Sequence, residues 1–169
     1  MNFNQTIKTI LENNDAFDQS YKSNMGDVII YQDANHDYHR IGGPAIIYAD
    51  GTKRWYYHGY LHRTDGPAEI VRPSDISAGY RTWWVNGKLH RTDGPAILYN
   101  NGRIMWYESG QRHREDGPAI IDRNHQKYYI RGVYYTKEAF EEFIKHKKFK
   151  EKIATKVNSL FTKEFLDEF

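Results

Sequence analysis

The residues with the most chemical capacity recur together along this chain. Histidine, arginine and aspartate share a seven-residue signature, HRxDGPA, at residues 62–68, 90–96 and 113–119, with a variant, HRIGGPA, at 39–45. Imidazole and carboxylate groups both bind zinc or nickel, so each His–Asp pair is a candidate metal site. The same groups can instead hold the chain together, since aspartate fixes turns through backbone N–H groups and arginine pairs with carboxylates.

The recurrence itself favours the structural role. A functional site usually appears once, where repeats differ, whereas residues shared by every unit are typical of the architecture. We therefore predict a latch between repeats, with no catalytic, metal or cofactor-binding residues in the chain. The predicted latch comprises His62, Arg63, Asp65, His90, Arg91, Asp93, His113, Arg114 and Asp116.

Nucleic acid is an alternative ligand. The signature arginines alternate with aromatic runs, a combination that single-stranded nucleic acid binders use for phosphate contacts and base stacking. The formal net charge is only +2, however, and the signature aspartates can neutralise the arginines. A lysine-rich stretch at 145–152 is a stronger basic patch, although such runs are usually solvated helix faces.

Enzymatic motifs are absent from the sequence. There is no G-x-S-x-G, no P-loop and no H-E-x-x-H. Small repeat sheets also present shallow surfaces, whereas catalysis needs groups held out of water. We predict that the protein is not an enzyme; an enzyme would need a pocket lined by residues that break the repeat, such as Tyr57, His58 and Glu108.

The spacing of the signatures indicates the elements that carry them. Successive signature arginines are 23, 28 and 23 residues apart, a period typical of stacked supersecondary units. After each GPA come a β-prone run, a turn signal such as Asp50-Gly51, and an aromatic run. Each unit is therefore predicted to be a β-hairpin, and the five extra residues of the second unit to lie in an exposed loop at 72–79.

Two aromatic columns run through the units. The first holds Trp55, Trp83, Trp106 and Tyr128, and the second holds Tyr56, Trp84, Tyr107 and Tyr129. Adjacent residues of a strand point to opposite faces. We expect the tryptophan face to form the core and the other face to be lined with tyrosines.

The flanking segments have helical periodicity. Apolar residues recur at helical spacing near the start of the chain and again after Thr136, a candidate N-cap. We predict an N-terminal helical cap at 1–22, a β-hairpin repeat domain at 23–135 and a C-terminal helical segment at 136–169, bent or interrupted at the lysines. The fold class is mainly β with helical caps (α+β), in which an antiparallel β-meander of hairpins forms a twisted, elongated sheet.

The composition fits a small protein of a reducing compartment. Among 169 residues there is no cysteine, which excludes disulfides and cysteine-based zinc sites. The N-terminus lacks the basic and apolar regions of a secretory signal, and no stretch is apolar enough to span a membrane. We expect a cytoplasmic protein with no membrane partner.

The repeats resemble the MORN type over roughly residues 38–135. The resemblance rests on the aromatic pair, the Asn-Gly or equivalent step and HRxDGPA, a variant found in uncharacterised proteins of large DNA viruses, phages and bacteria. It implies a meander of hairpins with a binding or scaffolding role and no shared catalytic centre. The chain departs from the pattern at Ile41-Gly42 and at Asn124-His125, as terminal units would.

These observations predict a non-enzymatic protein-interaction module. The resemblance implies a phage or viral accessory protein that inhibits or recruits a host protein, in the host cytoplasm. The alternative is a protein that sequesters a nucleotide or single-stranded nucleic acid, and a homodimer is compatible with either function. Partner-binding candidates vary between units at regular positions: Tyr57, Tyr60, Arg81, Lys88, Glu108 and Gln111, with the 72–79 loop.

Overall fold

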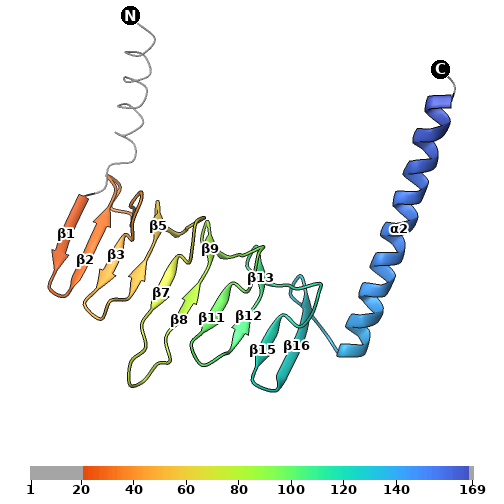
Figure 1. The fold of residues 1–169 in the computed structure, drawn as a ribbon. Helices are drawn as coiled ribbons and strands as arrows, with labels where there is room; N and C mark the ends of the chain where they lie inside the picture. Colours follow the sequence, from red (N-terminus) through yellow and green to blue (C-terminus); the bar gives the residue numbers. More distant parts are fainter. Residues whose placement is uncertain (1–20, 168–169) are drawn as a thin grey trace, which may run out of the picture.

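The computed structural model describes residues 21–167, which form one open antiparallel sheet followed by a helix (Figure 1). The sheet has eleven strands in the order β1-β2-β3-β4-β7-β8-β11-β12-β15-β16-β17. Their bounds are Tyr21–Met25, Val28–Gln32, Ile46–Tyr48, Lys53–Arg54, Glu69–Val71, Tyr80–Thr82, Ile97–Tyr99, Ile104–Met105, Ile120–Asp122, His125–Ile130 and Val133–Tyr135. The prediction of a mainly β fold with an antiparallel sheet is confirmed.

Each repeat contributes two neighbouring strands to this sheet and then a second, smaller hairpin. The small hairpins pair β5 (Tyr56–Tyr57) with β6 (Tyr60–Leu61), β9 (Trp84–Val85) with β10 (Lys88–Leu89), and β13 (Tyr107–Glu108) with β14 (Gln111–Arg112). Their two-residue turns have positive φ at both positions, as in Asn86 (48°) and Gly87 (70°). Type I′ turns require this conformation, which asparagine and glycine adopt most readily.

The core lies under the small hairpins and is built from the last residue of each signature and the residue after it. The four signature alanines (Ala45, Ala68, Ala96, Ala119) are fully buried. Ile97 and Ile120 flank Met105 on adjacent strands, and Leu89 and Tyr107 from the small hairpins pack against this cluster. A side chain larger than alanine at the four positions would separate the hairpins from the sheet.

The tryptophans do not form this core, contrary to expectation. Trp55, Trp83 and Trp106 are half-buried, and none belongs to a strand. Each stands between a strand of the eleven-stranded sheet and a small hairpin, where an arginine guanidinium covers its ring. Amphipathic arginine thus supplies the cover that a second apolar layer would give.

Three polar residues, Arg54, Glu69 and Thr82, lie next to one another across strands β4, β7 and β8, in a row whose other members include Ile46, Ile97, Met105 and Ile120. Glu69 occupies the place that Ile46, Ile97 and Ile120 hold in the other units. Its carboxylate accepts hydrogen bonds from Arg54 Nε at 2.8 Å and from Thr82 Oγ1 at 3.1 Å. Because both carboxylate oxygens have donors, the buried charge is paired.

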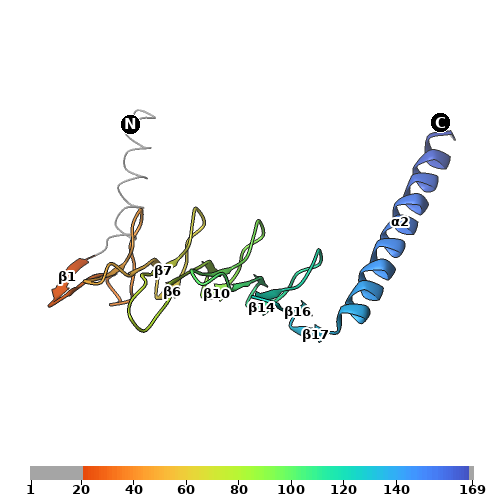
Figure 2. The same cartoon turned by 60° about the horizontal axis from the view of Figure 1, so that its bottom comes forward.

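The C-terminal segment is one helix, α2 (Lys137–Asp167), that continues through the lysines without interruption. The Thr136 hydroxyl accepts the backbone N–H of Ala139 as its N-cap. Phe140 and Phe143 pack on Tyr128 and Tyr135 of the last two strands, and the rest of the helix extends beyond the sheet (Figures 1 and 2).

The expected N-terminal helix lies outside the described residues. The 72–79 loop connects β7 and β8, with Ile76 98% exposed at its tip. Among residues 21–167, no helix combines the length and apolar character needed to cross a bilayer.

Candidate interaction surface

The signature arginines make the same three contacts in successive units. In the third unit, Arg91 Nε donates to Asp93 Oδ1 at 2.8 Å and Nη1 donates to the Pro95 carbonyl at 3.3 Å. The guanidinium carbon lies 4.0 Å from the ring centroid of Trp83. Arg63 and Arg114 repeat the arrangement on Trp55 and Trp106.

This packing explains the glycine of HRxDGPA. A Cβ atom on Gly94 would lie 3.0 Å from Arg91 Cζ, and one on Gly66 would lie 3.0 Å from Arg63 Cζ. Such a contact is closer than van der Waals distance, so a side chain there would push the guanidinium away from its tryptophan. The glycine therefore serves the arginine contact.

The signature histidines connect each unit to the next. His90 Nδ1 accepts the backbone N–H of Ser109, which stands in the turn of the following small hairpin, at 3.1 Å. His39, His62 and His113 accept the equivalent N–H from His58, Asn86 and Arg131. This hydrogen bond engages Nδ1, so a metal ion at a signature histidine could bind only through Nε2.

The signature aspartates are exposed, and each forms an ion pair with the arginine of its own signature. The hydrogen bond from Arg63 and its charge lower the pKa of Asp65, and Arg91 does the same for Asp93. The hydrogen bond from Arg114 likewise lowers the pKa of Asp116. The carboxylates are about 79% exposed, so each arginine carries its counter-ion to the surface.

The first unit has a different arrangement in place of this pair. Ile41 and Gly42 stand where the other signatures have threonine or glutamate and aspartate, and Arg40 packs on Tyr31 instead of tryptophan. Asp33, at the end of β2, is buried and accepts a 2.7 Å hydrogen bond or ion pair from His58 Nδ1.

The Asp33, His39 and His58 cluster has ligand atoms within 4.8 Å of one another, and within the described part of the chain it is the group that could hold a metal ion. The rings of His39 and His58 stack with centroids 4.2 Å apart. His39 Nδ1 and Asp33 Oδ2 already interact with His58, through its backbone N–H and its ring. Together these contacts tie the first two units to each other.

The Asp33 contacts predict an acid-sensitive N-terminal end. Burial acts to raise the pKa of Asp33, but hydrogen bonds from His58 and from the backbone N–H groups of Asp37 and Asn35 outweigh it and lower the pKa below 3.8. A carboxyl with a lowered pKa stabilises the fold above its unfolded pKa, and this contribution is lost as pH falls through the folded value.

We therefore expect Asp33→Asn to lower the urea midpoint at pH 7 and to flatten its decline below about pH 4. Urea titrations from pH 2 to pH 7 measure both effects. Asp75→Asn, in the exposed 72–79 loop, is the matched control and should follow the wild-type curve. Parallel acid limbs for Asp33→Asn and wild type would contradict the assignment.

Successive units enclose three grooves, one at each junction. The first lies between Arg40 and Trp55, the second between Arg63 and Trp83, and the third between Arg91 and Trp106. Their volumes are about 330, 470 and 690 Å³. Each groove is bounded by the signature loop of one unit, by the tryptophan of the next and by that unit's signature loop.

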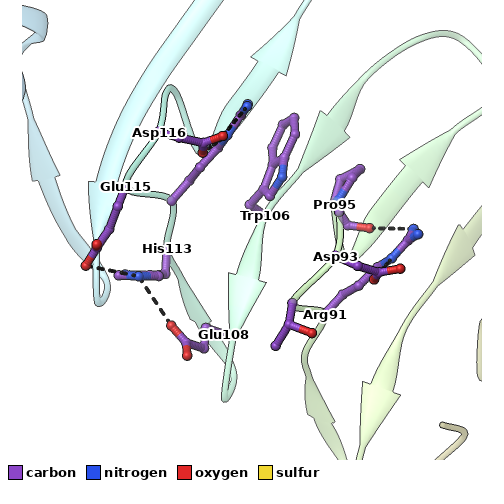
Figure 3. A pocket seen from close by; sticks show the side chains of 11 residues that line it. Arg91, Asp93, Pro95, Trp106, Glu108, His113, Glu115 and Asp116 are labelled. Atoms are coloured by element: carbon purple, nitrogen blue, oxygen red, sulfur yellow. Dashed lines mark hydrogen bonds and ion pairs between the residues drawn. The ribbon is translucent and has the colours of Figure 1, made fainter.

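The third groove carries the most charge (Figure 3). His113 Nε2 lies 3.3 Å from Glu108 Oε2 and 3.7 Å from Glu115 Oε1. Because His113 Nδ1 accepts a backbone N–H, Nε2 carries the ring proton and faces both carboxylates. Lys147 of α2 also contacts Glu115, so the helix reaches the edge of this groove.

Five of the six predicted partner residues lie on the small hairpins, next to their turns. Tyr57 and Tyr60 form a cross-strand pair, as do Glu108 and Gln111, while Lys88 pairs with Val85. All five are exposed. Arg81 is exposed too, but it lies on β8 in the long sheet and is paired with Ile70 and Leu98.

The small hairpins and the Asp33 cluster escaped prediction. The hairpins are signalled by the glycine that follows each aromatic pair, most plainly in Asn86-Gly87. Asp33 lies before the first signature, at no repeated position, so the sequence gives no sign of its contact with His58.

Comparisons of the chain with protein-family models, with characterised proteins and with solved structures found no match in any of the three.

Proposed function

We propose that this protein is a non-enzymatic interaction module whose small hairpins bind a protein partner. The observation that carries the proposal is a row of exposed residues on the small hairpins. These residues differ from unit to unit, whereas the sheet and the signature contacts beneath them repeat. Tyr57, Tyr60, Lys88, Glu108 and Gln111 project from the small hairpins, and β5, β9 and β13 follow one another along one side of the sheet (Figure 1). Repeat proteins commonly present binding residues in this way, and tyrosine is enriched at binding hot spots.

The contacts of the arginines support a protein partner over nucleic acid. Arg63, Arg91 and Arg114 each have a carboxylate, a carbonyl and an indole as partners. A phosphate would have to displace these groups before it gained a bidentate contact. Sequestration of a nucleotide or single-stranded nucleic acid remains the second candidate, because α2 has five exposed lysines: Lys145, Lys148, Lys150, Lys152 and Lys156.

The MORN resemblance supports the same proposal on independent grounds. It connects the HRxDGPA units with binding and scaffolding roles, and the variant with viral and phage proteins. We infer a small accessory protein that inhibits or recruits a host factor in the host cytoplasm.

The test is an affinity capture from host lysate with nuclease treatment and a moderate-salt wash. We expect one protein to remain bound to the wild-type chain after both treatments. The triple variant Tyr57→Ala, Tyr60→Ala and Lys88→Ala should lose it while circular dichroism shows an unchanged fold. Lys53→Ala is the control for an exposed cation away from the small hairpins. Recovery of nucleic acid alone, released by salt through counterion exchange, would support the second candidate instead.

A further inference from the structure

The three grooves recur at a spacing fixed by the sheet. Each unit adds two strands, and neighbouring strands lie about 4.8 Å apart, so equivalent grooves are spaced at about 9.6 Å. A ligand that occupies successive grooves must present side chains on one face at that interval.

A polyproline II helix meets this requirement. It has three residues per turn with a rise of about 3.1 Å, so every third residue returns to the same face after about 9.3 Å. A β-strand repeats its face at about 6.7 Å and an α-helix at about 5.4 Å per turn. Neither of these intervals matches the spacing of the grooves.

The lining of the grooves suits the same ligand. Each contains an indole beside a signature loop, and Figure 3 shows Trp106 between Asp116 of its own unit and Pro95 of the preceding one. Aromatic grooves of this kind dock proline-rich segments, since the preformed polyproline II conformation costs little entropy on binding.

The charges of the lining change along the row. The first groove has Arg40 and Arg63 against a single carboxylate, Asp65. The second has two arginines and two aspartates, Asp65 and Asp93. The third has Arg91 and Arg114 against four carboxylates (Asp93, Glu108, Glu115 and Asp116), of which Glu115 also pairs with Lys147 of α2, and it is still the most acidic of the three. A bound segment would therefore place its basic end over the third groove.

We infer that the partner presents an extended, proline-rich segment in the polyproline II conformation, with a side chain of every third residue in successive grooves and basic residues at the third. This inference rests on the proposed function and names the chemistry of its partner. The spacing of the grooves selects a segment with a three-residue period, and the carboxylates of the third groove determine which end of the segment binds there.

Two synthetic twelve-residue peptides test the period. One has proline at every third position and two arginines at one end, and the other has the same composition with its prolines at uneven spacing. Three of the four tryptophans line the grooves, so quenching of protein fluorescence reports binding. We expect the regular peptide to bind at least about tenfold more tightly. Equal binding, or no binding by either peptide, would overturn the inference.

Thr92 offers a way to block the grooves without disturbing the latch. It is exposed and lines both the second and the third groove. Thr92→Trp should weaken binding of the regular peptide by about tenfold or more. Asn124→Trp, in the exposed turn between β15 and β16, adds a ring outside the grooves and should have no effect. Loss of binding in both variants, or in neither, would contradict the assignment of the site.

Glu108→Gln tests the direction and keeps the size of the side chain. It should weaken binding of the peptide that carries arginines more than binding of a version with alanines in their place. If Thr92→Trp still captures the lysate protein as well as wild type does, the inference fails while the proposed function stands. If the triple hairpin variant also captures it, the proposed function fails.

Discussion

Replacing Glu69 with alanine should destabilise the fold by about 2–3 kcal/mol, because it leaves the half-buried Arg54 without its carboxylate partner. Breaking a fully buried ion pair costs more, but the Arg54 side chain is 32% exposed and gains some hydration. Thr82 also loses its hydrogen-bond acceptor. Urea denaturation followed by circular dichroism measures the change.

The chain itself supplies the matched control for this prediction. Arg54 stands at the position that Met105 holds two units later, and Glu69 at the position of Ile120. The double variant Arg54→Met and Glu69→Ile recreates that apolar pair and should restore most of the lost stability. A double variant less stable than Glu69→Ala would show that the polar network stabilises the sheet beyond its charge balance.

Replacing Arg91 with alanine should cost about 2–3 kcal/mol in the free energy of unfolding. Most of the loss comes from the charged hydrogen bond to Pro95 and from the stacking on Trp83, since the pair with the exposed Asp93 contributes little. Thermal or urea unfolding gives the value.

Arg91→Lys keeps the charge but lacks the planar fork, so we expect it to lose more than half of the same free energy. Arg81→Ala removes an exposed arginine and should stay within about 0.5 kcal/mol of wild type. If Arg91→Lys were as stable as wild type, charge alone would explain the recurrence of the signature arginine.

Much of the fold follows from residues close together in the sequence. Asp50-Gly51 and Asn100-Asn101-Gly102 identify the turns of the long hairpins, and the alternation of β-prone and turn residues defines their strands. The helix after Thr136 was equally accessible, since an N-cap and apolar periodicity are local signals.

The location of the core was not accessible from those patterns. Side-chain size favours the tryptophans as the core, yet the fully buried positions are the alanines of GPA. The contact of each histidine with the next turn is also a property of the stacked units. It joins residues such as His90 and Ser109, whose relation appears only when two repeats lie side by side.

Each signature histidine accepts a backbone N–H of the following unit, so the same contact recurs at every junction between units in residues 21–167. Stability then accumulates from one junction to the next, as in a one-dimensional lattice with nearest-neighbour coupling. Gain or loss of a whole 23-residue unit would preserve the histidine contact at every remaining junction. Such a chain can change its length by duplication without redesign of any interior contact.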